Sequence, residues 1–112
     1  MTCLSGLYHW TNLTSLEEAM LKKASGGSVA AYAPTGLQVH TGHDYLLYGF
    51  YDEMFAGAGT LGEAIMGAKL NLNGSTGSYQ DLQDTYMLLG DPAMSLNVWS
   101  ADSAIHLPSL FD

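Results

Sequence analysis

The segment Ser25-Gly26-Gly27-Ser28-Val29-Ala30-Ala31-Tyr32-Ala33-Pro34 decides how the rest of the chain is interpreted. Its two glycines end a preceding helical pattern, and its proline closes a short apolar run over residues 28–33. The run has no polar alternation, which is typical of a strand buried on both of its faces. The segment therefore predicts a buried strand that follows a helix.

Before and after this segment, helical and strand patterns alternate along the chain. Thr14 or Ser15 caps a first helix, because a glutamate follows each of them after three residues in a capping-box pattern. Apolar spacing predicts a second helix over residues 46–55, and Thr60 caps a third. The predicted strands are 1–4, 28–33, 86–89 and 94–99, and the predicted loops are 35–43 and 71–78. This alternation indicates an α/β layered fold with a mainly parallel sheet.

Composition excludes several classes of partner and site. Three basic residues against eleven acidic ones give a net charge of −8, which repels nucleic acid and anionic membrane surfaces. The apolar runs are far shorter than the ~20 residues that cross a bilayer. A single cysteine excludes an internal disulfide and a multi-cysteine zinc site. The 47% of apolar residues favours one folded domain.

Cys3 is the side chain with the most distinctive chemical position. It stands at the predicted end of a strand that enters a turn at Ser5-Gly6, where α/β enzymes place reactive groups. The N–H groups of such a turn are expected to be free near the sulfur, where they would stabilise an oxyanion. A small buried filler is the other interpretation of this cysteine. As a nucleophile it also needs a histidine that accepts its proton.

Three segments, in this order, give the chain a family resemblance: Thr2-Cys3-Leu4-Ser5-Gly6; residues 15–20 with 26–36; and residues 60–64 with 88–94. They resemble the nucleophile segment, the following helix and strand, and the closing helix, turn and final strand of gingipain-like cysteine peptidases, in the caspase-like clan. The resemblance covers residues 1–98. It implies a caspase-like three-layer sandwich, of which residues 1–99 would form the C-terminal part. Residues 100–112 would be a tail or linker.

The same resemblance implies endopeptidase chemistry by a Cys-His dyad. Cys3 is then the nucleophile, with its own N–H as one oxyanion donor. The family's base is a histidine that precedes the cysteine by far more than the two residues present here. We therefore expect the base outside this chain, supplied by a missing N-terminal half of the domain or by a partner chain. Without it, the isolated chain is expected to be inactive.

The four histidines of the chain receive different interpretations. His9 is expected in an exposed loop, and His106 lies in the unpatterned tail. His40 and His43 fall in the predicted loop, which in the family helps to line the specificity pocket, so His40 is the candidate substrate contact. His40, His43 and Asp44 lack the helical spacing of a convincing zinc site, so no metal ligand is predicted. Calcium is a candidate cofactor through the family alone, with no ligands named.

The predicted partners are peptide or protein substrates. The family resemblance also implies an extracellular or cell-surface location, although residues 1–8 do not resemble a signal peptide. Two alternatives stay open at this point. One is a catalytically inactive binding or structural module that keeps the fold. The other is a gene fragment.

Overall fold

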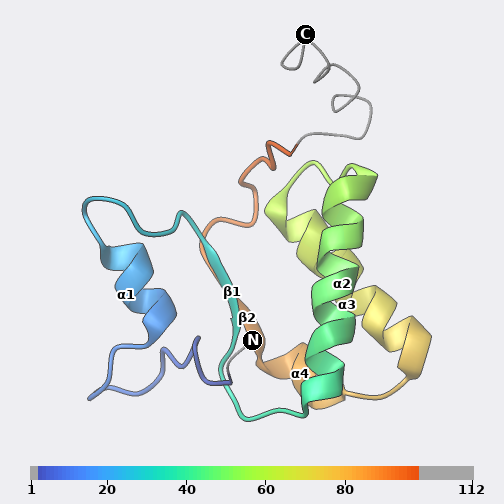
Figure 1. Ribbon diagram of the computed structural model, residues 1–112, viewed down its shortest axis with the longest axis horizontal. Helices are drawn as coiled ribbons and strands as arrows, with labels where there is room; N and C mark the ends of the chain where they lie inside the picture. The colour runs from blue at the N-terminus through green and yellow to red at the C-terminus, as the bar shows by residue number, and fades with distance from the viewer. Residues whose placement is uncertain (1–2, 99–112) are drawn as a thin grey trace, which may run out of the picture.

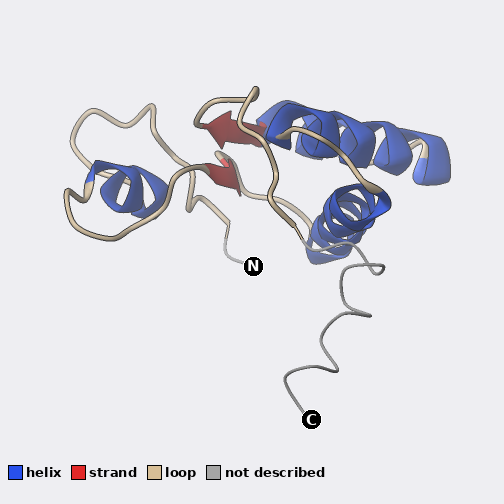
Figure 2. Ribbon diagram, turned by 90° about the horizontal axis from the view of Figure 1, so that it is seen from above, coloured by secondary structure: helices blue, strands red, loops and turns tan. Residues whose placement is uncertain are grey.

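The computed structural model describes residues 3–98, so the predicted tail over residues 100–112, with His106, lies outside the described residues. The elements in chain order are α1 (Leu16–Lys22), β1 (Ala31–Pro34), α2 (His40–Ala56), α3 (Leu61–Thr76), α4 (Gln80–Thr85) and β2 (Tyr86–Leu89). The two strands stand side by side, with α1 on one side of them and α2 and α3 on the other (Figure 1, Figure 2). This arrangement confirms an α/β fold.

The strand pair is antiparallel, so the prediction of a mainly parallel sheet is wrong for these two strands. Pro34 pairs with Tyr86 and Ala31 with Leu89. The chain leaves β1 at Pro34, and α4 returns it at Thr85, at the same end of the sheet. A strand that re-enters at the end where its neighbour left must run in the opposite direction. Where the last strand was predicted, the described residues form only an isolated bridge between Thr60 and Ser95.

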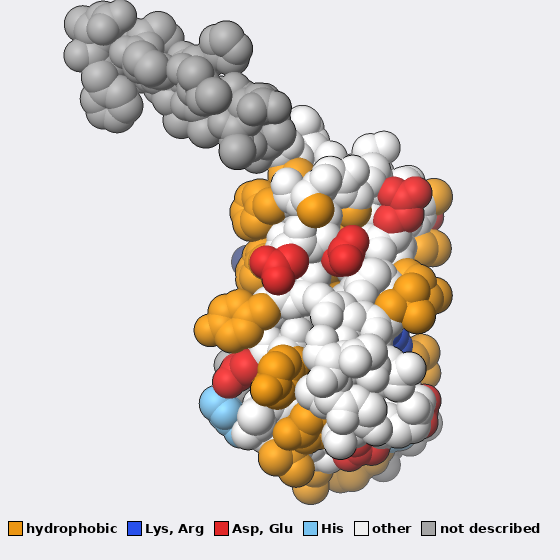
Figure 3. All heavy atoms as spheres, turned by 90° about the vertical axis from the view of Figure 1, so that its right-hand side faces the viewer, with side chains coloured by type: hydrophobic (Ala, Val, Ile, Leu, Met, Phe, Trp, Pro, Cys, Tyr) orange, Lys and Arg blue, Asp and Glu red, His pale blue; other side chains and the backbone are white. Residues whose placement is uncertain are grey.

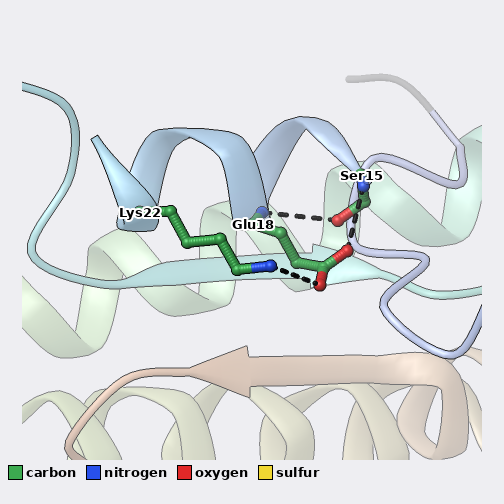
Figure 4. A network of polar contacts seen from close by, with 3 residues as sticks. All are labelled: Ser15, Glu18 and Lys22. Carbon is green, nitrogen blue, oxygen red and sulfur yellow. Dashed lines mark hydrogen bonds and ion pairs between the residues drawn. The ribbon is translucent and has the colours of Figure 1, made fainter. Parts of the chain in front are cut away.

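The first helix begins where its capping residues predict. Ser15 Oγ accepts the Glu18 N–H at 3.3 Å, and the Ser15 N–H donates to Glu18 Oε2 at 3.0 Å (Figure 4). Lys22 Nζ, one turn later, lies 3.5 Å from Glu18 Oε1. The bond from the Ser15 N–H lowers the pKa of Glu18 from its ordinary value. None of the residues of α1 is buried, so this helix is held mainly by its own polar contacts.

The second helix starts six residues earlier than its apolar spacing predicts. It begins at His40, so the predicted loop is wrong for its last residues, and His40 and His43 are helical. Gly42 explains how this turn packs, because a Cβ there would overlap Leu82 Cδ1 and lie 2.8 Å from Tyr79 Cδ1. The absence of a side chain lets the first turn of α2 lie directly against α4 and its N-cap residue.

The third helix begins at the predicted cap and ends later than predicted. Thr60 and Glu63 form the expected capping box. The loop prediction for residues 71–78 is wrong as far as Thr76, because the helix continues past Leu72, which is only 1% exposed. Gly77, with a φ of 57°, ends it in the left-handed conformation. Burial of Leu72 therefore outweighs the weak helical preference of the Asn and Gly residues around it.

The hydrophobic core lies between the helices α2, α3 and α4 and the strand β2. Its buried members are Leu46, Ala68, Leu72, Leu82 and Tyr86, with Tyr32, Phe50 and Tyr79 packed against them. Lys69 closes one end, since its ammonium group donates to Gln83 O at 2.6 Å and to Tyr86 O at 2.9 Å.

The outer side of α2 and α3 carries hydrophobic side chains among acidic ones (Figure 3). The large exposed hydrophobic residues of these two helices are Tyr45, Tyr48, Tyr51, Phe55, Met66 and Leu70. Across the described range 3–98, every helix is too short or too polar to pass through a bilayer.

Candidate active site

Cys3 is exposed and lies in a turn beside the C-terminal end of β1. The turn is anchored by the Gly6 N–H, which donates to Pro34 O at 3.1 Å. The prediction that the turn leaves its N–H groups free is therefore wrong for Gly6. Leu4, directly after the cysteine, has a φ of 65°, a left-handed conformation that costs a residue with a side chain roughly 1 kcal/mol or more. A strained residue beside a nucleophile is common at active sites.

The sulfur of Cys3 faces the first turn of α2. Its Sγ lies 3.9 Å from His43 Nε2 and 3.7 Å from the carbonyl oxygen of Gln38, just before the helix. The imidazole and the carbonyl are both acceptors for a thiol proton, but only the imidazole can keep it at neutral pH. The structure thus brings a histidine of this chain to the sulfur, although the sequence placed the base elsewhere.

The ring nitrogen of His43 that does not face Cys3 contacts a tyrosine. Its Nδ1 lies 2.7 Å from the hydroxyl oxygen of Tyr86, and the two rings meet edge to face with centroids 5.4 Å apart. His43 is 3% exposed and Tyr86 1%. Burial, with a smaller contribution from Cys3, raises the pKa of Tyr86 to about 12, so the phenol stays protonated at neutral pH. The imidazole is therefore fixed by a neutral hydroxyl group.

The environment of His43 favours its uncharged form. Burial lowers the pKa of His43 from its ordinary value of 6.5, and His40 one turn earlier lowers it further. The carboxylate of Asp44 acts in the opposite direction with a smaller effect. A histidine that is neutral at pH 7 has a free lone pair on one nitrogen, which is the form that accepts a proton.

The other predicted site residues are placed as follows. His40 is the first residue of α2; its side chain is 88% exposed, and its Nδ1 lies 3.7 Å from Asp44 Oδ2. Nothing in the structure tests its contact with substrate, which stays a prediction. His9 lies in an exposed turn, as expected. Within residues 3–98, no three His, Cys, Asp or Glu side chains are arranged to hold a metal ion.

A cavity of about 280 Å³ lies on the α2 side of the strands. Its walls include Tyr32, Leu46, Phe50, Leu61 and Tyr86. Tyr86 lines this cavity, and its hydroxyl group also contacts His43. Cys3 and His43 are not among the residues that line the cavity.

The sequence analysis placed His43 in a loop and did not predict its contact with Cys3, and it did not single out Tyr86. The signal for His43 was its spacing, because His43, Leu46 and Phe50 follow each other at helical intervals and all face the core region. The apolar stripe that predicted α2 thus extends backward by one turn through the histidine. Tyr86 carried no signal beyond that of a buried strand residue.

Comparison with known families shows which family the chain belongs to. The model of peptidase family C25 matches residues 1–97. The chain belongs to this family. The match confirms the predicted resemblance to gingipain-like cysteine peptidases. No curated protein and no solved structure matches the chain. Membership of family C25 connects the chain with cysteine peptidases, and so with hydrolysis of peptide bonds.

Proposed function

We propose that the chain is the nucleophile-bearing part of a cysteine endopeptidase, with Cys3 as the nucleophile. One observation carries the proposal. In a chain matched by a peptidase family over residues 1–97, the cysteine is exposed and lies 3.9 Å from an imidazole nitrogen. A sulfur sealed in the core could not meet a substrate.

In this proposal the chemistry follows the usual course of thiol peptidases. The Cys3 thiolate attacks the carbonyl carbon of the scissile peptide bond, and the tetrahedral intermediate collapses to an acyl-enzyme with loss of the amine. Water then hydrolyses the thioester. The Cys3 N–H is a proposed donor to the oxyanion of both tetrahedral intermediates.

We propose that residues 1–99 form the C-terminal half of a caspase-like three-layer sandwich, with residues 100–112 as a tail or linker. Helices on both sides of the strand pair support three layers. The described sheet has only two strands, so each has an outer edge to which further strands of the domain can add. An N-terminal half or a partner chain would supply those strands and the base histidine of the family.

The proposed substrates are peptides or proteins met outside the cell or at its surface. His40 is the proposed substrate contact of this chain. Its imidazole is highly exposed at the start of α2, three residues before the histidine that faces Cys3. A peptide bound at Cys3 would have to pass near this end of the helix.

Peptide hydrolysis tests the proposal. The 112 residues are assayed alone and joined to the coding sequence that precedes them, with quenched fluorescent peptides and with Cys3→Ala as control. We expect hydrolysis from the longer protein, a loss of at least roughly a thousandfold in Cys3→Ala, and none from the 112 residues alone. Hydrolysis that survives in Cys3→Ala would refute the nucleophile. Hydrolysis by the 112 residues alone would refute the external base.

A further inference from the structure

We propose that the cavity on the α2 side of the strands is a binding site for a small, uncharged aromatic molecule that carries a hydrogen-bond acceptor. The cavity has a volume of about 280 Å³ and is partly open to solvent. Because neither Cys3 nor His43 lines it, its ligand is not the part of a substrate that reacts at the sulfur. The site goes beyond the proposed endopeptidase activity and does not depend on it.

The volume of the cavity sets the size of the ligand. An apolar protein cavity of roughly 150 Å³ is large enough to bind benzene. The cavity beside α2 has nearly twice that volume, so it admits a benzene ring with a small substituent. A polypeptide segment is too large for it, although a single side chain would fit. The site therefore takes a small molecule of about the size of a monosubstituted benzene.

The walls of the cavity favour an uncharged ring. Most of them are aromatic or aliphatic side chains, namely Leu46, Leu47, Phe50, Tyr51, Leu61 and Tyr86. Within residues 3–98, no charged side chain lines the cavity. An aromatic ligand can stack on these rings or meet them edge to face. A carboxylate would lose its hydration there without a compensating cation, and the net charge of −8 would add repulsion.

Tyr32 gives the site its preference for a hydrogen-bond acceptor. This tyrosine lines the cavity, and its hydroxyl oxygen is buried without a hydrogen-bond partner among residues 3–98. Burial, with a smaller contribution from Tyr86, raises the pKa of Tyr32, so the hydroxyl group remains a donor at neutral pH. A buried donor without an acceptor is unfavourable, because it has given up its hydrogen bond to water. A ligand oxygen that reaches the hydroxyl group restores that bond.

The donor of the site is held in place before any ligand binds. The ring of Tyr32 packs against Phe50 and Tyr86, with ring centroids 5.9 Å and 5.1 Å apart. Its backbone lies in β1 opposite Leu88 of β2. On the helix side, Leu46 is 0% exposed and belongs to the core. Binding therefore orders few side chains, which keeps the entropic cost of association low.

Acetophenone, toluene and benzoate are the probes that test the site. Acetophenone has a ring and an acceptor, toluene lacks the acceptor, and benzoate carries a charge. Titration of the 112-residue chain followed by ¹H–¹⁵N NMR measures each dissociation constant and locates the site from the shifted amides. We expect acetophenone to bind with a dissociation constant of about 1 mM or below, and benzoate at least about tenfold more weakly. Acetophenone shifts that do not saturate, or benzoate binding as tight as that of acetophenone, would overturn the proposal.

Tyr32→Phe tests the hydrogen bond, because it keeps the ring and removes only the hydroxyl group. We expect it to weaken acetophenone binding by about two- to tenfold, the equivalent of one hydrogen bond. Toluene binding should change by less than about twofold, since toluene makes no such bond. Equal changes for the two probes would show that the hydroxyl group does not contact the ligand, and would overturn the preference for an acceptor.

Ala30→Leu tests the location, because Ala30 lines the cavity and a larger side chain there takes up part of its volume. We expect acetophenone to bind at least roughly fivefold more weakly. Ala24→Leu makes the same change at an exposed position outside the cavity and should bind like the native chain. Circular dichroism confirms that the variants are folded, and Leu47→Phe repeats the test from α2 if Ala30→Leu is not. Native affinity in a folded filling variant would overturn the location.

The longer protein tests whether the occupant is a small molecule. Joined to the coding sequence that precedes them, the 112 residues should bind acetophenone about as tightly as they do alone. Loss of binding in the longer protein would show that a side chain of the preceding sequence fills the cavity, and would overturn the proposal. Peptide hydrolysis has no part in these measurements, so an inactive endopeptidase leaves the binding site intact.

Discussion

The N-terminal segment with α1 and the helical region of α2 and α3 are held in different ways. No residue of α1 is buried, and Leu16 on its first turn is 59% exposed. By contrast, Leu46 of α2 and Ala68 of α3 are 0% exposed. The segment that carries Cys3 is held by the buried side chain of Leu7, which is 7% exposed, and by backbone bonds such as Gly6 N–H to Pro34 O and Glu17 N–H to Ser5 O.

The candidate site joins these two regions. Its sulfur belongs to the lightly packed segment, whereas His43 and Tyr86 belong to the dense one. The difference indicates that dense packing fixes the imidazole, and that the sulfur is brought to it by a few backbone hydrogen bonds and the burial of Leu7. Local opening of the N-terminal segment would therefore separate the pair without unfolding the core.

The largest expected contrast is between two leucines truncated to alanine. Leu72→Ala opens a cavity at a residue that is 1% exposed and should lower the free energy of unfolding by about 2–5 kcal/mol. Leu16→Ala, on α1, should change it by less than about 0.5 kcal/mol. Urea unfolding measures both. Similar losses in the two variants would show that α1 is part of the same packed unit.

Gly42→Ala is expected to have the next largest effect. The new Cβ would overlap Leu82, which is fully buried, so we expect the free energy of unfolding to fall by about 1–3 kcal/mol. Gly74→Ala is the control, because no atom lies within 4 Å of its added Cβ. This control should stabilise α3 by up to about 1 kcal/mol. Equal effects would refute the close packing at Gly42.

The two capping boxes give a smaller contrast. Thr60→Ala should lower the global free energy of unfolding by about 1 kcal/mol, since α3 is part of the core. Ser15→Ala should instead raise amide exchange within α1 and leave the global value nearly unchanged. Hydrogen exchange with mass spectrometry distinguishes local from global opening. A global loss in Ser15→Ala as large as that in Thr60→Ala would contradict the comparison.

The smallest expected effect is a pH dependence of stability that comes from His43. Its pKa in the folded chain lies below the ordinary value of 6.5, so the unfolded chain binds more protons at mildly acidic pH. The contribution of the neutral His43 to the free energy of unfolding is fully present above pH 6.5. It is lost as the pH falls from 6.5 through the pKa of His43 in the folded chain. Urea midpoints of the native chain and of His43→Gln check it. In the variant, the urea midpoint should fall less steeply as the pH is lowered below 6.5. An unchanged pH dependence would contradict the burial of a neutral imidazole.

Local signals predicted several elements well. The glutamates three residues after Ser15 and Thr60 fixed two helix starts, because a capping box depends only on neighbours in the chain. The apolar run at residues 86–89 coincides with β2. The turn at Gly90-Asp91-Pro92 is also present, with Asp91 Oδ1 accepting the Ala93 N–H at 2.9 Å. The three segments at residues 2–6, 15–36 and 60–94, taken in order, led to the correct family.

Features that depend on distant residues were not predictable. The first turn of α2 has weak helical preference and forms where Gly42 meets Leu82 and Tyr79, some forty residues later in the chain. The approach of His43 to Cys3 depends on that turn. The antiparallel pairing of β1 and β2 depends on how α2, α3 and the short α4 return the chain. The spacing of His43 with Leu46 and Phe50 indicates a shared helix face, but spacing and composition do not show which distant residues that face contacts.

The tautomer of His43 is the most direct test of the contact between Cys3 and His43, and ¹⁵N NMR of the imidazole nitrogens in the native chain measures it. We expect a neutral ring at pH 7, protonated on Nδ1 and unprotonated on Nε2, whose Nε2 signal shifts in Cys3→Ala. A ring protonated on Nε2, or an Nε2 signal that is the same with and without the sulfur, would contradict the pairing of Cys3 with His43.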